Sequence, residues 1–128
     1  VTAAGFVPHR SHDDRMYKRR RARASDGHLC DSISEVLVDN WFAGHRISHS
    51  RDVSYPGTNY RTDWTLEDNV FVEYFGLAKD SPRYDRSIQE KRGICEKHNI
   101  TLIELYSSDL YPEFVVGNKL EEYVKIQS

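Results

Sequence analysis

The sequence predicts a mixed α/β fold in which helices pack on a sheet. First, two apolar-rich runs at residues 60–66 and 70–75 flank turn-forming residues 67–69, which is the pattern of a β-hairpin. Second, apolar residues recur at helical spacing on both sides of this hairpin. Third, residues 100–106 form a continuous apolar run of the kind found in buried strands. The predicted order of elements is α-β-β-β-α-β-α.

The first helix is predicted from its end signals and its periodicity. Ser32 and Glu35 have the spacing of a capping box, with Ser32 as the N-cap. Gly44 follows at a suitable place for the C-terminal end. Helical spacing predicts one buried face, formed by Ile33, Val36, Leu37, Asn40 and Trp41.

The remaining elements follow in order along the chain. Residues 46–55 alternate between apolar and polar side chains and predict a half-exposed strand, and the Pro-Gly pair at 56–57 turns the chain into the hairpin. A Ser-Pro pair at 81–82 starts a helix over residues 83–98. An amphipathic helix is predicted from residue 110 to about residue 126. The predicted buried face of the middle helix carries Tyr84, Ile88, Lys91 and Cys95.

Composition bounds the class of protein. The 128 residues suffice for one hydrophobic core, and the 38% hydrophobic and 30% charged residues are typical of a globular chain. No run approaches the ~18 apolar residues of a membrane span, and no signal peptide is visible. We therefore expect an intracellular protein, in the cytoplasm and nucleoid or in the nucleus, without a membrane partner. The two cysteines cannot build a disulfide framework and favour a reducing compartment.

Charge is distributed unevenly along the chain. Residues 1–25 carry seven basic and two acidic side chains, a net charge of +5, whereas residues 26–128 carry eleven basic and eighteen acidic ones, a net charge of −7. We expect a flexible basic arm over residues 1–25 and a single domain over residues 26–128. Such an arm is suited to phosphate binding, although it could also be a solvated leader or a localisation signal. The expected phosphate contacts are Arg15, Lys18, Arg19, Arg20, Arg21 and Arg23.

Two acids interrupt the strands of the predicted hairpin. Asp63 lies in the first strand and Glu73 in the second. A buried carboxylate is costly unless a hydrogen-bond donor or a metal ion compensates it. Acids on adjacent strands can lie side by side and share a divalent cation. The sequence therefore predicts a metal site at this pair.

Each candidate also has a simpler structural explanation. Asp63 could be an exposed strand residue, and Glu35 could only cap its helix. Lys91 could extend along its methylene stem to solvent. Three of the histidines that follow the arm are expected to do ordinary loop and strand work, namely His28, His45 and His49.

In combination these residues resemble the PD-(D/E)xK nuclease superfamily. The likeness is closer to a branch reading DF…IEY(F/W)G…Y…K…LIEL, found in nuclease-like domains attached to some helicases. It covers about residues 26–120. In this chain the motif is present as Asp63-Trp64, VEYFG at 72–76, Tyr84, Lys91 and LIEL at 102–105.

The resemblance implies a restriction-endonuclease-like αβββαβ core, with a mixed central sheet flanked by helices and an extra C-terminal helix. It also implies a Mg²⁺-dependent endonuclease that hydrolyses phosphodiester bonds in DNA, with Mn²⁺ able to substitute. Asp63, Glu73 and the backbone carbonyl of Tyr74 are then the implied metal ligands. Glu35 would bind a second ion or polarise the attacking water.

The chain departs from the family pattern at two positions. Thr62 stands where the family's name-giving proline would be, and Phe75 stands where its lysine is expected. In this branch the lysine commonly comes from the following helix, which assigns the role to Lys91. The basic role could also fall to a neighbour on that helix, namely Arg86, Gln89 or Arg92.

The missing lysine also leaves a second interpretation open. In that interpretation the chain is a catalytically decayed nuclease-fold module that binds DNA or a protein partner without cutting. A third is an interaction protein whose basic arm binds an acidic partner. The preferred DNA structure, assembly as a homodimer and membership of a larger nucleic-acid-processing protein are all left open by the sequence.

Overall fold

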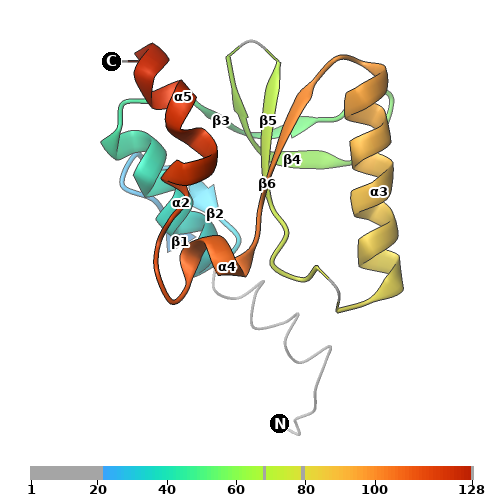
Figure 1. The fold of residues 1–128 in the computed structure, drawn as a ribbon, viewed down its shortest axis with the longest axis horizontal. Helices are drawn as coiled ribbons and strands as arrows, with labels where there is room; N and C mark the ends of the chain where they lie inside the picture. The colour runs from blue at the N-terminus through green and yellow to red at the C-terminus, as the bar shows by residue number, and fades with distance from the viewer. Residues whose placement is uncertain (1–21, 68, 79, 128) are drawn as a thin grey trace, which may run out of the picture. The chain divides into compact units, whose positions relative to one another are not determined.

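The computed structural model describes residues 22–67, 69–78 and 80–127 (Figure 1). It contains both helices and a mixed sheet, so the predicted α/β class is confirmed. The chain divides into two compact units, residues 1–44 and 45–128, and each is described by itself. Among the helices of the described residues, none is both long enough and apolar enough to cross a membrane.

The first unit begins with a small hairpin that the sequence did not predict. Strand β1 (Ala22–Arg23) pairs antiparallel with β2 (Leu29–Cys30). Gly27 has a φ of 95° in the connecting turn, a backbone conformation that residues with a Cβ rarely adopt. Residues 22–25 of the expected arm thus lie in this hairpin and its turn, and residues 1–21 lie outside the described part of the chain.

Helix α2 (Ile33–Gly44) begins and ends where the sequence predicts. The Ser32 hydroxyl accepts a hydrogen bond from the Glu35 backbone N–H at 3.2 Å, as an N-cap does. Its buried face was predicted wrongly, because Ile33 is 48% and Leu37 37% exposed. The apolar residues of this helix occur around most of its circumference. Helical spacing therefore allows more than one choice of buried face. The buried residues of α2 are Glu35, Val38, Asp39 and Phe42.

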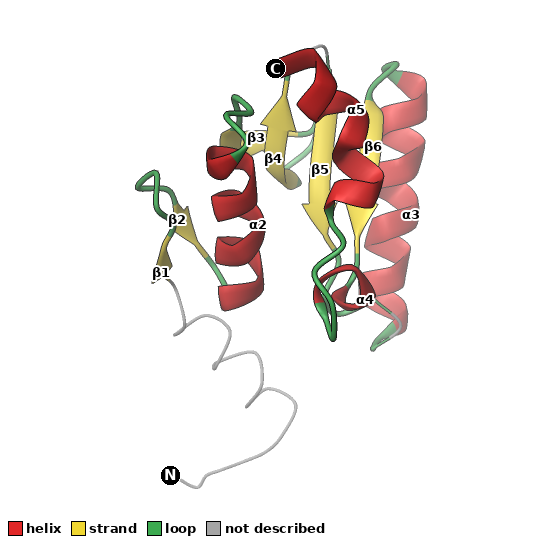
Figure 2. Ribbon diagram, turned by 60° about the vertical axis from the view of Figure 1, so that its left-hand side comes forward, coloured by secondary structure: helices red, strands yellow, loops and turns green. Residues whose placement is uncertain are grey.

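The second unit is built on a four-stranded sheet (Figure 2). Its strands are β3 (Ser50–Ser54), β4 (Arg61–Leu66), β5 (Val70–Tyr74) and β6 (Thr101–Leu105). They lie in the order β3-β4-β5-β6, with antiparallel pairing up to β5 and parallel pairing between β5 and β6. The predicted hairpin is therefore confirmed as β4 and β5.

The parallel pair requires a crossover, and helix α3 (Pro82–Lys97) supplies it. Ser81 caps this helix by accepting from the Tyr84 N–H at 3.1 Å, close to the predicted start. Ile88 and Cys95 are buried along α3, and Cys95 joins a core cluster with Tyr55 and Phe71. The helix thus packs on the sheet in the way its apolar spacing predicts.

Three expectations for the second unit need correction. Strand β3 begins at Ser50 rather than at residue 46. Strand β6 lies at the sheet edge and has only two buried residues, Ile103 and Leu105, whereas all five residues of β5 are buried. Instead of one C-terminal helix from residue 110, a short α4 (Ser107–Leu110) and a separate α5 (Gly117–Gln127) are present. Pro112 lies between them, and its ring disfavours a helical conformation for the residue before it.

Candidate functional site

Glu73 is a buried acid in the middle of the most buried strand. Glu73 is 3% exposed. Its side chain shares a face of β5 with that of Phe71, because side chains alternate along a strand. The carboxylate oxygen Oε2 accepts a hydrogen bond from the Tyr55 hydroxyl at 2.7 Å. The same oxygen lies 2.8 Å from the Lys91 ammonium nitrogen Nζ. The buried charge is therefore compensated by one neutral and one cationic donor.

Lys91 reaches this carboxylate from helix α3. Its side chain is 14% exposed, so it does not extend into solvent. The ammonium lies 5.5 Å from the ring centroids of Tyr55 and Tyr60 and 5.6 Å from that of Phe75. Aromatic rings at this distance attract a cation through their negative faces. The ion pair and the three rings fix the position of the ammonium.

Asp63 lies in the neighbouring strand β4. Pairing between the strands extends to Trp64 opposite Val72, and the next residues along are Asp63 and Glu73. Alternation therefore places both acids on one face of the sheet. The Asp63 oxygen Oδ2 accepts a hydrogen bond from the Tyr74 backbone N–H at 2.8 Å. The structure thus brings together Asp63, Glu73, Tyr74 and Lys91.

The environment of Glu73 shifts the pKa of two neighbouring groups. Burial, and then the negative charge of Glu73, raise the pKa of the Tyr55 hydroxyl above its ordinary value. Tyr55 is therefore protonated at neutral pH and can donate to the carboxylate. Burial and the same charge raise the pKa of the Cys95 thiol to about 11, which keeps it neutral. Cys95 is accordingly a core residue rather than a reactive thiolate.

A second ion pair lies beside the first. Glu104 is the parallel-strand neighbour of Glu73 in β6. The Arg92 guanidinium donates to both of its carboxylate oxygens, each at 2.7 Å. Successive residues of α3 thus neutralise acids on two neighbouring strands. Because Arg92 is bound to Glu104, the geometry favours Lys91 over Arg92 as the cation of the acid pair.

The Glu104 pair should make stability depend on pH. Hydrogen bonds from Arg92 lower the pKa of Glu104 below its ordinary value of 4.5. Its contribution to folding is therefore complete above that value and is lost as the pH falls through the lower pKa of the folded state. We expect Glu104→Gln to be less stable than wild type at about pH 6, with the difference shrinking towards about pH 3. Urea unfolding at both pH values measures this, and a pH-independent difference would contradict it.

A cavity of about 670 Å³ opens next to this region. It is lined by residues of the β5–α3 connection, of α3 itself and of the α4 start. Gln89 and Arg92 from α3 supply polar groups, and Phe75 supplies an aromatic wall. Phe75 is shared with the surroundings of the Lys91 ammonium, whereas Lys91, Glu73 and Asp63 are not among the residues that line the cavity.

The other predicted site residues precede the second unit in the sequence. Glu35 belongs to the first unit, where its Oε1 accepts from the Asp31 N–H at 3.4 Å and its own N–H binds the cap. Arg23 lies in β1 and donates to the Gly27 carbonyl at 2.9 Å, so it is part of a hairpin rather than of a free arm. The remaining predicted phosphate contacts lie outside the described residues, namely Arg15, Lys18, Arg19, Arg20 and Arg21.

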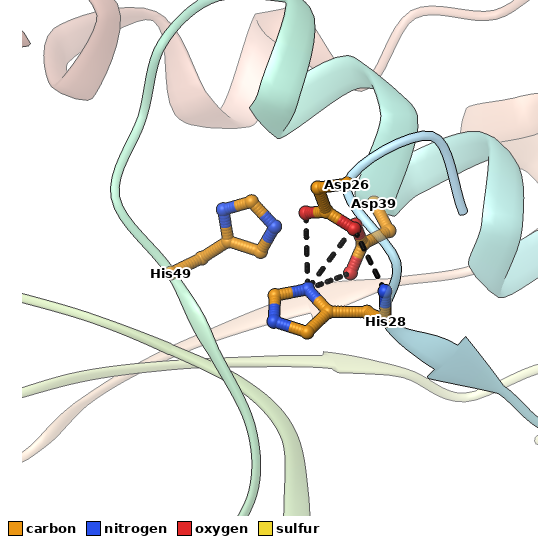
Figure 3. Close-up of side chains that lie close together, drawn as sticks. All are labelled: Asp26, His28, Asp39 and His49. Carbon is orange, nitrogen blue, oxygen red and sulfur yellow. Dashed lines mark hydrogen bonds and ion pairs between the residues drawn. The ribbon is translucent and has the colours of Figure 1, made fainter. Parts of the chain in front are cut away.

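Within the first unit the structure assembles a cluster that the sequence did not predict (Figure 3). The ring nitrogen Nδ1 of His28 lies 3.0 Å from Asp26 Oδ2 and 3.2 Å from Asp39 Oδ2. Two signals in the sequence could have indicated this cluster. They are the Asp-x-His spacing in a turn and the acid Asp39 among the buried residues of α2. His49, also drawn in Figure 3, belongs to the second unit, where its Nδ1 lies 2.7 Å from the Ile47 carbonyl oxygen.

Fold and site together define a mixed α/β protein with acids on adjacent strands and a lysine from the crossover helix. Comparisons of the chain with protein-family models, with curated proteins and with solved structures give no match.

Proposed function

We propose that this protein is a Mg²⁺-dependent endonuclease of the PD-(D/E)xK kind that hydrolyses phosphodiester bonds in DNA. The observation that carries the proposal is the 2.8 Å contact between Lys91 Nζ and Glu73 Oε2. It brings a lysine from α3 to the place where the resemblance requires a cation, although position 75 is phenylalanine. The contact joins Glu73 on the strand with Lys91 on the helix, which are both positions of the branch motif.

The arrangement of elements supports the same proposal. Helix α2, strands β3, β4 and β5, helix α3 and strand β6 follow one another in the αβββαβ order that the resemblance implies. Helices α3 and α5 lie on opposite faces of the sheet (Figures 1 and 2). The acids lie on the two central strands of the sheet, β4 and β5.

The donor set fits a hard divalent ion. Asp63 and Glu73 offer carboxylate oxygens, which are the ligands that Mg²⁺ prefers. Both donors to Glu73 described above bind Oε2. A bound ion would lower the pKa of a coordinated water and neutralise charge on the scissile phosphate.

The other residues orient and balance this pair. Tyr55 donates to Glu73 and thereby holds the carboxylate in one orientation. Lys91 supplies a fixed positive charge that would face the negative charge developing on the phosphate oxygens. Backbone N–H of Tyr74 holds Asp63 in the same way that Tyr55 holds Glu73.

The test is a cleavage assay on supercoiled, single-stranded, flap and junction DNA. Each substrate is incubated with Mg²⁺, with Mn²⁺ or with EDTA. We expect cleavage of at least one substrate with either ion and none with EDTA. Absence of cleavage from all four substrates would contradict the proposal.

A specific observation favours a second candidate, a decayed nuclease-fold module that binds DNA without cutting. Oε2 of Glu73 already accepts from both Tyr55 and Lys91, so the acid is well satisfied without a metal. The E-x-K lysine is also replaced by Phe75. This candidate predicts salt-dependent DNA binding together with no metal-dependent nicking, which the cleavage assay distinguishes.

Deletion of residues 1–21 should weaken DNA binding about equally for all sequences. The segment carries six basic and two acidic side chains. Each lost phosphate contact should reduce the slope of log K against log[salt] by ~0.9 on duplex DNA. Ending the deletion before Ala22 leaves the β1–β2 hairpin in place. Binding titrations from low to high salt measure the slope, and an equal slope for both proteins would assign the segment another role.

A further inference from the structure

We propose that Asp26, His28 and Asp39 form a binding site for a Zn²⁺-type transition-metal ion in the first unit. The site uses none of the residues of the acid pair, and the inference does not depend on nuclease activity. Each of the three residues offers one ligand atom, and these atoms all lie within 4.8 Å of one another.

The separations between the ligand atoms suit a tetrahedral ion. Nδ1 of His28 lies 3.0 Å from Asp26 Oδ2, and it lies 3.2 and 3.4 Å from the two oxygens of Asp39. Zinc bonds to nitrogen and oxygen of about 2.0–2.2 Å place neighbouring tetrahedral ligands about 3.3–3.5 Å apart. The separations of His28 Nδ1 from the carboxylate oxygens therefore lie within about half an ångström of those expected around a zinc ion.

The charges in the cluster also favour a bound cation. Two carboxylates converge on one ring nitrogen, which can carry at most one hydrogen. Asp39 is completely buried, and burial of an ionised carboxylate is costly unless a cation balances it. A divalent ion bound between the two carboxylates would balance their charge.

The surrounding backbone holds the ligands in place. Oδ1 of Asp26 accepts from the His28 backbone N–H at 3.0 Å, which leaves Oδ2 directed at the imidazole. The Ser25 N–H donates to Asn40 Oδ1 at 2.7 Å and ties the turn to helix α2. Such outer hydrogen bonds orient metal ligands in proteins. An ion at this position would connect the β1–β2 turn to α2 through Asp39.

The ligand types select the class of ion. Imidazole suits zinc, copper and nickel, whereas Mg²⁺ and Ca²⁺ prefer oxygen ligands alone. Three protein ligands leave a fourth position for water. We therefore expect Zn²⁺ and Co²⁺ to bind here in the presence of excess Mg²⁺.

The experiment uses the full chain, stripped with a chelator and returned to buffer with excess Mg²⁺. Calorimetric titration with Zn²⁺ is expected to show one bound ion, and binding should raise the melting temperature. Titration with Co²⁺ should give visible absorption without a thiolate-to-cobalt charge-transfer band, because the site contains no sulfur. A charge-transfer band would assign the metal to a cysteine and overturn the proposal.

Variants locate the ion. We expect His28→Gln and Asp26→Asn each to weaken Zn²⁺ affinity by ~10-fold or more, the scale seen when even a supporting residue of a metal site is lost. Both side chains are partly exposed, so these variants should fold even if Asp39→Asn does not. His98→Gln, at the exposed C-cap of α3, should bind Zn²⁺ like the wild type. Unchanged affinity in both the His28 and Asp26 variants, or no Zn²⁺ binding by the wild type, would overturn the assignment.

Discussion

Replacing Lys91 with methionine is expected to lower the single-turnover rate of DNA cleavage by ~10²-fold or more. The same change should lower the free energy of unfolding by about 3–5 kcal/mol, since it leaves the buried Glu73 carboxylate without its cation. Methionine keeps a similar length and fills the space among the three rings. Quench-flow cleavage and urea unfolding measure the two effects.

Two control variants separate catalysis from stability. Lys97→Met changes an exposed lysine of the same helix and should alter neither quantity by much. The double variant Glu73→Gln/Lys91→Met removes both charges, so it should regain much of the lost stability without regaining cleavage. Lys91→Arg should restore cleavage poorly, because a planar guanidinium differs in shape from the ammonium held by the rings. Wild-type cleavage by a folded Lys91→Met variant would pass the role to Gln89 or Arg86.

Asp63→Asn and Glu73→Gln are each expected to abolish detectable cleavage and to weaken Mn²⁺ binding strongly. Each substitution removes one carboxylate of the proposed metal site while keeping the side chain's shape. Asparagine can still accept from the Tyr74 N–H, so Asp63→Asn should stay folded. Calorimetric titration with Mn²⁺ measures the loss directly, without any DNA substrate.

Glu104→Gln is the matched control for these acids. Glu104 lies beside Glu73 in the sheet, yet it is held by Arg92. Its replacement should lower stability without changing Mn²⁺ affinity. If both acid-pair variants bind Mn²⁺ like the wild type, the assignment of the metal site is wrong.

The elements that the sequence predicts well are those with strong local signals. The Ser32 and Ser81 caps fix two helix starts, and the turn at residues 67–69 fixes the hairpin. A role for Lys91 beside the acids was also expected, from the resemblance and from its position as the one charge on an apolar helix face, and Lys91 contacts Glu73 in the structure. These inferences depend on side chains near one another in the chain or on a single unusual charge.

The features that the sequence did not reveal depend on tertiary contacts. Two-residue strands such as β1 and β2 have too few residues to show a period. The buried stripe of α2 could not be chosen from spacing, because apolar residues occur around the whole helix. His28 lies near a turn, and Asp39 lies eleven residues later in helix α2. Their contact could not be predicted from sequence spacing.

Strand β5 has a consequence for the chain while it is being synthesised. All five of its residues are buried in the finished fold, and its parallel partner β6 begins only at Thr101. Until β6 emerges from the ribosome, one edge of this apolar strand is unpaired and open to association with other nascent chains. Until Lys91 of helix α3 packs against it, Glu73 is a hydrated negative charge within this strand. Charges at such positions oppose aggregation, so this glutamate also protects the incomplete protein.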